Sequence, residues 1–455
     1  MHINVLVGGG TAGSVLASRL SEDPLVTVLL LEAGDDHYSV PFSNIPAVTP
    51  LLQRSSMDWS FRTVSQENAC LGLNHKQNIW PRGKCLGGTS QMNFMLYSRG
   101  HPDQYGQFEV SGLKGWSYND LLPYFRASEK IAFGRKLKSS TRENRGLSGV
   151  LNVDFQHERS LLANLFMQTV TDMGYVNNTD YNYPSKDGFS WLQYFKKDGI
   201  RSSVAVQYLE PALKRFGLHV VTGAVVSKVL FNEENRAVGV EYYHGSAMHR
   251  VLTNREVILS AGVVGSPQIL MRSGIGDPSH LVQFSDITLR KALPAVGKNL
   301  IDHVIVDLVY GLNESVGYPL KETLSFFGTA KAGLKYVVQK QGPLANIPFE
   351  LAGFFRTGHQ QPVHLPNIQI YVATAISSLS FFKANLNLRD EVFNATYVNA
   401  ASYPGSMAVA VSLTQPRSRG KVELQSTNVL DPPIIDPNYL SDEADVDAIV
   451  DGVLI

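Results

Sequence analysis

The sequence is poor in three features that mark other classes of protein. Its two cysteines, Cys70 and Cys85, are too few for a disulfide framework and are not spaced as a metal site, so we predict no bound metal. Forty Lys and Arg residues balance forty Asp and Glu residues, which leaves no net charge to attract nucleic acid or an anionic membrane. The longest apolar run near the start, Val26 to Leu31, is far below the roughly 18 residues of a membrane span. We therefore expect a soluble protein with no membrane span and no nucleic-acid partner.

The composition is that of an ordinary globular protein. Of the 455 residues, 44% are hydrophobic and 18% are charged, which is enough apolar material for one large core or two smaller ones. Met1 is followed within a few residues by what reads as a first strand, so this sequence shows no signal peptide. We expect two domains and leave the cellular compartment open.

The first thirty residues alternate strand and helix patterns. Ile3 to Val7 is a short buried-strand run, Ala12 to Leu20 has helical apolar spacing, and Val26 to Leu31 is again strand-like. This order predicts a β-α-β unit. Strand character returns from Leu218 to Tyr243 and at Val257 to Leu259, so the domain that contains this unit is predicted to be discontinuous in sequence.

The later part of the chain predicts a second domain. Ile368 to Val372 and Met407 to Leu413 are longer β-like runs, whereas Ser128 to Gly146 is rich in Lys and Arg and predicts a solvated loop or lid rather than packed structure. The predicted class is α/β, with a Rossmann-type first domain and a sheet-containing α+β second domain. The expected boundaries are residues 1–128 and 185–305 for the first domain, and 129–184 and 306–455 for the second.

Gly8, Gly10 and Gly13 fill the glycine positions of a G-x-G-x-x-G pattern directly after the first predicted strand. In a dinucleotide site these residues make a tight turn, admit the pyrophosphate and let the helix pack closely. The N–H groups of Thr11 and Ala12, where the helix opens, can then face phosphate. A chain with 38 glycines shows the pattern by chance with odds of roughly one in four. Its place between a strand and a helix favours a dinucleotide site over a plain turn.

Glu32 ends the second predicted strand. A carboxylate there is placed to accept hydrogen bonds from the adenosine ribose hydroxyls, and it repels a 2′-phosphate, which disfavours NADP. These features do not separate FAD from NAD.

A second glycine-rich stretch, Trp80 to Gly100, makes that distinction. Gly87 and Gly88 let the backbone approach a flat ring, while Thr89, Ser90 and Asn93 offer polar contacts. The whole stretch resembles the first sequence motif of the glucose-methanol-choline (GMC) oxidoreductase family. The resemblance implies FAD as the cofactor, and it extends the expected cofactor-binding residues to Arg82, Phe94, Met95 and Leu96.

Gly262 to Gly276 is similar to the other GMC motif, with Pro267 expected near the first turn of a helix. Arg272 stands where the family commonly has an apolar residue. Further similarity extends from Ile3 to the last residue and is closest to the animal glucose and choline dehydrogenase branch, which is often secreted. The resemblance places the backbone of Val226 near the adenine. It also implies non-covalent FAD, because Met92 occupies the position where members with tethered flavin have a histidine.

The family, as the resemblance implies, oxidises alcohols by passing a hydride to flavin N5 while a histidine near the carboxy terminus takes the hydroxyl proton. None of the twelve histidines lies in residues 365–455. His303 and His101 are interpreted as structural residues, so we assign no catalytic residue. The chain ends inside what the resemblance makes the helix that leads to the catalytic segment, and we expect it to be incomplete there.

Three hypotheses remain. The first is an FAD-dependent dehydrogenase for a small alcohol or sugar; the second is a truncated, non-catalytic FAD-binding protein; the third, an NAD-dependent dehydrogenase, requires the stretch up to Gly100 to be coincidence. The substrate, the electron acceptor and the oligomeric state stay open.

Overall fold

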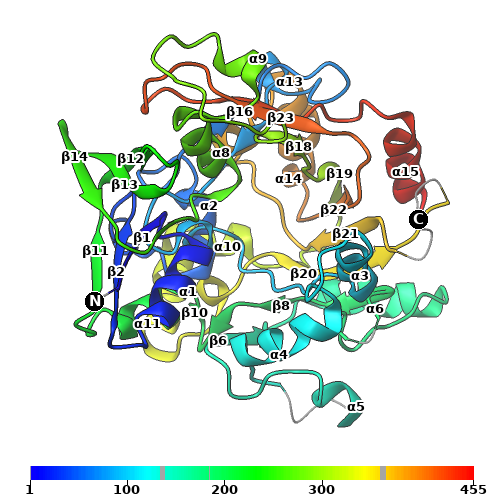
Figure 1. The fold of residues 1–455 in the computed structure, drawn as a ribbon. Coiled ribbons are helices and arrows are strands. Elements are labelled where there is room, and N and C mark those ends of the chain that lie inside the picture. The colour runs from blue at the N-terminus through cyan, green and yellow to red at the C-terminus, as the bar shows by residue number, and fades with distance from the viewer. Residues whose placement is uncertain (1, 134–138, 184, 359–364) are drawn as a thin grey trace.

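The computed structural model describes residues 2–133, 139–183, 185–358 and 365–455. Figure 1 shows a parallel sheet on one side of the molecule and a larger antiparallel sheet on the other. The parallel sheet has the strand order β11-β2-β1-β15, and its members are β1 (His2–Val7), β2 (Val26–Leu31), β11 (Leu218–Val221) and β15 (Glu256–Leu259). Residues 218–221 and 256–259 therefore join the sheet that residues 2–31 begin, so this sheet is discontinuous in sequence.

Strand β1 is apolar at nearly every position because both faces of its sheet are covered. Leu6 packs with Ala17 of helix α1 (Thr11–Leu20) on one face. Val5 and Val7 point to the opposite face and pack with β12 (Ala224–Phe231) and helix α8 (Gly262–Arg272). β12 forms a separate antiparallel sheet with β13 (Ala237–His244) and β14 (Ala247–Leu252).

The antiparallel sheet has the order β19-β22-β21-β20-β7. Its strands are β7 (Gly188–Trp191), β19 (Val304–Leu312), β20 (Phe349–Phe355), β21 (Ile368–Ala373) and β22 (Gly405–Leu413). Leu351 on one face packs against helices α6 (Leu161–Asp172) and α15 (Glu443–Leu454). Its neighbour Ala352 faces the other way, toward Met95 of the second glycine-rich stretch. This sheet thus supports that stretch from behind.

Shorter elements connect the two sheets. The predicted α/β class is confirmed, while the exact domain boundaries stay a prediction; β7 lies beyond residue 184 yet belongs to the antiparallel sheet.

No helix in the described residues is long and apolar enough to cross a membrane. The remaining larger elements are α3 (Pro102–Val110), α4 (Tyr118–Ser128), β5 (Glu129–Ile131), β6 (Leu151–Phe155), β18 (Lys298–Leu300), α10 (Leu320–Leu324), α11 (Phe326–Gln339), α12 (Ser380–Leu386), α14 (Asn399–Ser402), β23 (Gly420–Glu423) and β24 (Ile434–Asp436).

The segment Ser128 to Gly146 corrects the prediction of a solvated loop. β5 pairs with β6 in parallel, and Glu129 and Arg145 at the two ends of the segment are fully buried. Residues 134–138 lie outside the described residues. The prediction was wrong for the two ends because charged residues can be buried when they neutralise one another and satisfy their hydrogen bonds.

Four buried charged side chains form a cluster around this segment: Arg99, Glu129, Arg145 and Asp180. The Arg145 Nε lies 2.9 Å from the Glu129 Oε1, and the Arg145 Nη1 lies 2.6 Å from the Asp180 Oδ2. The Arg99 Nη2 lies 2.5 Å from the same Glu129 oxygen. Arg99 is the next-to-last residue of the second glycine-rich stretch, so the cluster anchors the far end of that stretch to the segment around Asp180.

Removing one arginine from this cluster is expected to destabilise the fold strongly. In an Arg145→Met variant the Glu129 and Asp180 carboxylates lose a partner while they remain buried, which costs roughly 3–5 kcal/mol. Urea unfolding followed by circular dichroism measures the loss. Arg19→Met is the control, because the Arg19–Glu22 pair is about half exposed and contributes at most about 1 kcal/mol. Equal effects of the two substitutions would contradict the prediction.

Candidate functional site

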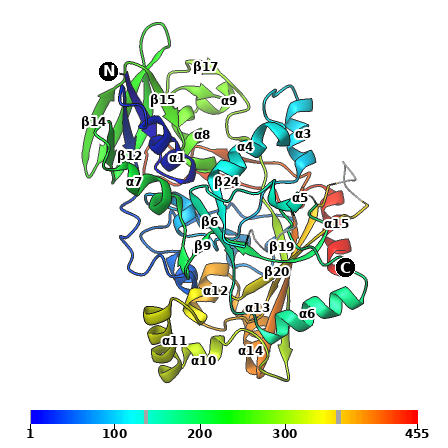
Figure 2. The ribbon, with the colours of Figure 1, turned by 90° about the horizontal axis from the view of Figure 1, so that it is seen from below.

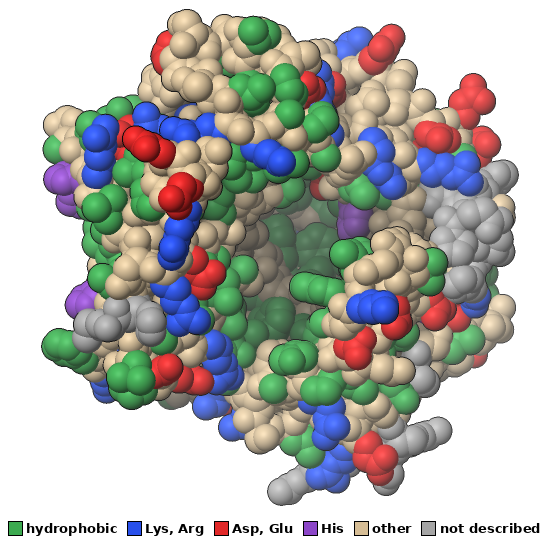
Figure 3. All heavy atoms as spheres, viewed as in Figure 1, with side chains coloured by type: hydrophobic (Ala, Val, Ile, Leu, Met, Phe, Trp, Pro, Cys, Tyr) green, Lys and Arg blue, Asp and Glu red, His purple; other side chains and the backbone are tan. Residues whose placement is uncertain are grey.

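A cavity of about 940 Å³ opens at the carboxyl ends of β1 and β2, where parallel sheets bind their ligands. The loop after β1 and Glu32 after β2 form one wall, and the start of α8 forms another. Residues 429–435, far away in sequence, lie across from them. The face of the molecule in Figure 3 is hollowed at its centre, with hydrophobic side chains along the hollow.

The three pattern glycines after β1 have different surroundings. A Cβ on Gly8 (φ +96°) would lie 2.6 Å from the Ser260 carbonyl oxygen, and a Cβ on Gly13 would lie 1.9 Å from the Gly8 oxygen. Packing therefore requires glycine at both positions. A Cβ on Gly10 would meet only the Gly88 Cα, at 3.9 Å, and Gly10 lines the cavity. This residue leaves room for a ligand rather than for the protein itself.

The two glycine-rich loops touch each other directly. The Gly87 N–H donates to the Gly9 carbonyl at 2.7 Å. Gly88 has φ +51°, and a Cβ there would lie 2.7 Å from the Gly10 Cα. Since any side chain on Gly88 would force the loops apart, the contact needs glycine. It brings two predicted motifs, 78 residues apart between Gly10 and Gly88, to one wall of the cavity.

Glu32 is buried beside this contact. Its carboxylate accepts hydrogen bonds from the Gly9 N–H at 2.7 Å and the Gly34 N–H at 2.9 Å. Burial raises the pKa of Glu32 to about 7, against the opposing effect of these backbone N–H groups. The side chain lines the cavity and retains acceptor capacity for a ligand hydroxyl.

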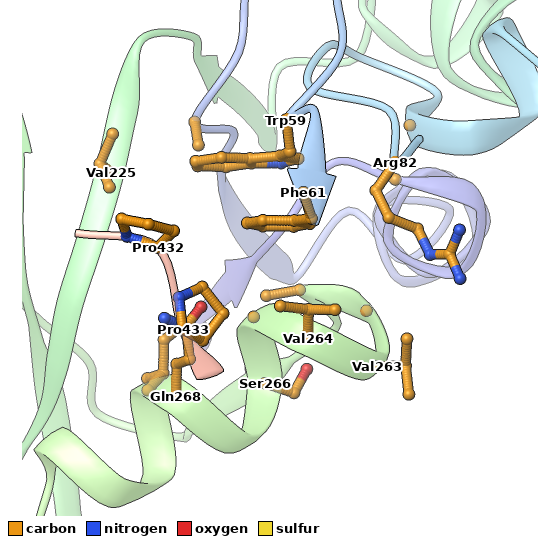
Figure 4. A pocket seen from close by; sticks show the side chains of 18 of the residues that line it. Trp59, Phe61, Arg82, Val225, Val263, Val264, Ser266, Gln268, Pro432 and Pro433 are labelled. Carbon is orange, nitrogen blue, oxygen red and sulfur yellow. The ribbon is translucent and has the colours of Figure 1, made fainter. Parts of the chain in front are cut away.

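An aromatic pair that the sequence analysis did not single out forms another part of the wall. Figure 4 shows the Trp59 and Phe61 rings stacked on each other beside Val264 and Pro433. Their centroids lie 5.6 Å apart with nearly parallel planes, and both residues line the cavity. Phe61 begins the short strand β3 (Phe61–Arg62), and Trp59 precedes it by two residues. This i, i+2 spacing is the period of one strand face and is the signal that could have revealed the pair.

Helix α8 presents its first residues to the cavity. It begins at Gly262, so Pro267 lies in the second turn. The prediction that Pro267 lies near the first turn was therefore wrong. Proline cannot donate to the Val263 carbonyl one turn earlier, and Val263 lines the cavity. Arg272 at the end of α8 also lines it; burial lowers the pKa of Arg272 to about 10, and its Nε has no hydrogen-bond partner among the described residues. A polar ligand atom would suit that position.

The predicted cofactor residues fall into two groups. Those in the first line the cavity: Gly8, Gly10, Thr11, Ala12, Glu32, Arg82, Gly88, Thr89 and Val226. Those in the second are not among the lining residues: Gly13, Gly87, Ser90, Asn93, Phe94, Met95 and Leu96. Gly13 packs α1 onto its loop, whereas the others belong to the second glycine-rich loop and its support.

Arg201 holds that second loop in place. Its Nη1 donates to the Asn93 carbonyl at 2.7 Å, to the Asn93 Oδ1 at 3.0 Å and to the Ser90 carbonyl at 3.2 Å. The Val204 N–H donates to the Ser90 Oγ at 3.3 Å. Arg201 is fully buried, and burial lowers its pKa to about 9. It acts on the loop from 108 residues further along the chain than Asn93, which local sequence reasoning could not reveal.

Phe94, Met95 and Leu96 continue the loop onto the antiparallel sheet. Phe94 packs edge-on against Phe349, with centroids 5.6 Å apart, and Met95 is buried with φ +60°. Leu96 forms a bridge to Tyr194. The loop is thus fixed between the parallel sheet on one side and the antiparallel sheet on the other.

Neither of the two histidines considered for catalysis is among the residues that line the cavity. The His101 ring caps α3, accepting from the Asp103 N–H at 3.2 Å. His303 lies exposed between β18 and β19 and is not among the lining residues. In the described part of the chain no group of His, Cys, Asp and Glu side chains is arranged to hold a metal ion.

Comparison with known proteins identifies the family. The GMC oxidoreductase amino-terminal model matches residues 3–305, and the carboxy-terminal model matches residues 416–454. The chain belongs to the GMC oxidoreductase family. It is a FAD-dependent oxidoreductase, since FAD is the cofactor of this family. The open Gly10 position, the buried Glu32 carboxylate and the unpaired Arg272 Nε suit a dinucleotide in the cavity of this GMC oxidoreductase.

The similarity extends over nearly the whole chain. The GMC oxidoreductase is 33% identical over 465 residues to an alcohol dehydrogenase (acceptor) of Pseudomonas putida, covering 100% of this chain and 77% of the relative. It is 34% identical over 455 residues to the mitochondrial choline dehydrogenase of Mus musculus, covering 97% and 70%. The crystal structure of pyridoxine 4-oxidase from Mesorbium loti superposes with a TM-score of 0.80 at 27% identity, covering 100% of this chain and 80% of that one.

A Gly10→Glu variant is expected to lose FAD. The new side chain would enter the cavity where a pyrophosphate at the α1 N-terminus would lie, and its charge would repel phosphate. The ratio of flavin to protein absorbance in the purified variant measures the loss, which should exceed tenfold. Gly106→Glu is the matched control, because a Cβ on Gly106 in α3 meets nothing within 4 Å and Gly106 lies outside the cavity lining. Unchanged flavin content in Gly10→Glu would refute the prediction.

Glu32→Gln is expected to change the pH dependence of stability in the FAD-free protein. Folding raises the pKa of Glu32 from 4.5 to about 7. Between pH 4.5 and about pH 7, the folded state therefore holds a proton that the unfolded chain has already released. This contribution to stability is complete below pH 4.5 and is lost as the pH rises to about 7. Relative to Glu32→Gln, the parent protein should lose at most about 3 kcal/mol over this range. Parallel stability–pH curves from urea titrations would argue against a raised pKa.

Proposed function

We propose that this GMC oxidoreductase binds FAD non-covalently in the cavity beside its two glycine-rich loops and oxidises the CH–OH group of a small alcohol or sugar. The contact between Gly10 and Gly88 carries the proposal, because it unites a phosphate-binding loop with a ring-binding loop along one wall. An NAD-dependent dehydrogenase would not need the second loop.

The lining residues suggest how the cofactor lies. The N–H groups of Thr11 and Ala12 at the start of α1 would face the pyrophosphate, with Gly10 leaving room for it. Glu32 would accept hydrogen bonds from the adenosine ribose, and the backbone of Val226 would lie near the adenine. This places the adenine end toward β12 and α8, beside Arg272.

The second loop would hold the flavin end. Thr89 lines the cavity, while Ser90 and Asn93 sit behind it and are fixed by Arg201. Arg82 lines the cavity beside Gly83, and Gly87, Phe94, Met95 and Leu96 hold the loop in shape. Met92 is buried at the position where members with a tethered flavin have histidine, which supports non-covalent binding.

FAD when bound supplies the acceptor for the hydride that leaves the carbinol carbon. The residues of the chain bind and orient the cofactor and exclude water from it. No histidine lines the described cavity, and none occurs in residues 365–455. We assign no catalytic base among the described residues; a positioned general base typically raises the rate by about 10²- to 10⁴-fold.

The names of the relatives narrow the substrate class. Similar proteins include an alcohol dehydrogenase, choline dehydrogenases and a glucose dehydrogenase of Drosophila pseudoobscura pseudoobscura. We propose a primary alcohol or a sugar as the donor and, from the motif resemblance, a place near the animal glucose and choline dehydrogenases. A dehydrogenase reaction is preferred to an oxidase reaction on the same ground.

An absorption experiment tests this function. The purified protein should show flavin bands near 370 and 450 nm, roughly where bound flavins absorb, and acid precipitation should release the flavin. Anaerobic mixing with primary alcohols, choline or glucose should bleach the 450 nm band, and the measurement is repeated with added imidazole, which can serve as a general base.

Each result has a clear meaning. Absence of flavin after incubation with FAD would refute the cofactor assignment. Bound flavin that no donor reduces, with or without imidazole, would leave a non-catalytic FAD-binding protein, which is the alternative function. Flavin that stays with the precipitated protein would refute non-covalent binding.

A further inference from the structure

Helix α11 presents an apolar surface to the solvent. Figure 2 shows α10 and α11 at the edge of the molecule, away from the parallel sheet. At 100° per residue, one continuous side of α11 carries only apolar residues, and all of them are exposed: Phe326, Phe327, Ala330, Leu334, Val337 and Val338. Phe326 and Phe327 are 85% and 84% exposed. We call these six residues the α11 face.

The rest of α11 packs normally onto the protein. Ala332 and Tyr336 point to the side opposite the α11 face and are buried. The Tyr336 hydroxyl donates to the Gly199 carbonyl at 3.3 Å. The helix is therefore held by one apolar side and turns a second one outward. A surface helix of a water-soluble protein ordinarily places polar residues there.

Basic residues lie along one side of the α11 face. Residues 320–340 contain four lysines and one acidic residue, Glu322. Lys331 and Lys335 follow the face on this side of the helix, and Lys340 caps the end of the helix. The Lys335 Nζ lies 2.5 Å from the Glu158 Oε1, so Glu158 offsets one of these charges. Lys321 in α10 donates to the Tyr403 carbonyl. The chain as a whole carries no net charge, so this is a local excess of positive charge next to exposed apolar side chains.

We propose that the α11 face binds the surface of an anionic lipid membrane. A helix with an apolar side, aromatic residues on it and lysines beside it lies in the membrane interface, with its apolar side among the acyl chains and its lysines near anionic headgroups. The 14 residues of α11 are too few to span a bilayer, which needs about 20. The binding is therefore along the surface.

The size of the α11 face favours a membrane over a second copy of the chain. A helix of 14 residues is roughly 21 Å long and about 10 Å wide. The α11 face therefore offers on the order of 200 Å², whereas a stable protein interface needs about 800 Å² from each partner. Insertion into lipid has no such threshold, because each side chain enters the acyl region independently.

Vesicle sedimentation with the FAD-loaded protein tests the proposal. The protein should sediment with vesicles of phosphatidylcholine and phosphatidylglycerol, and less with phosphatidylcholine alone. Phe327→Ser combined with Leu334→Ser should lower the bound fraction at least fivefold. Lys331→Glu should lower binding to the anionic vesicles only, and added salt should have the same effect.

A matched control uses exposed apolar residues elsewhere. Phe216 and Leu213, which are 88% and 45% exposed, lie in the FAD-binding half, and Phe216→Ser with Leu213→Ser should leave vesicle binding unchanged. Flavin content checks the folding of all variants. No sedimentation of the parent protein, or equal losses in the two double variants, would overturn the proposal. So would a dimer in light scattering that only Phe327→Ser with Leu334→Ser dissociates, since the α11 face would then join two copies.

Discussion

The contact between the two glycine-rich loops is the constraint on which the rest of the site depends. Gly87 donates to Gly9, and Gly88 approaches Gly10 so closely that a single added carbon would overlap it. Because backbone rather than side chains makes this contact, it fixes the loops without occupying the cavity. Everything that touches the cofactor cavity is arranged around this wall.

Each loop is supported by a different layer of the protein. The first loop rises from β1 and is held by Gly13 and Ser260, within the parallel sheet. The second is fixed by the Arg201 guanidinium and rests on the antiparallel sheet through Met95. A change in the relative position of the two sheets would open the cavity between the loops. Structural stability and cofactor binding are therefore coupled through the same contact.

The protein buries charge for two different purposes. The cluster of Arg99, Arg145, Glu129 and Asp180 is internally neutralised and is not part of the cavity lining, so its role is to hold segments together. Glu32 is buried without a cationic hydrogen-bond partner, which raises its pKa. It is stabilised by two backbone N–H groups instead. A carboxyl in this state can serve a ligand hydroxyl without a strong net charge near neutral pH.

The sequence by itself determined the features that depend on local backbone geometry. The β-α-β order, the strands of the discontinuous sheet and the glycines at positions 8, 10, 13, 87 and 88 could be predicted, because turns and close approaches restrict residue type at the position itself. Tertiary structure alone decided the burial of Arg145 and the hydrogen bonds from Arg201 to Asn93. It also decided that Trp59 and Phe61 line the cavity and that the α11 face points outward. These depend on which distant segments meet, and a local pattern shows that a helix has an apolar side without showing which side the protein covers.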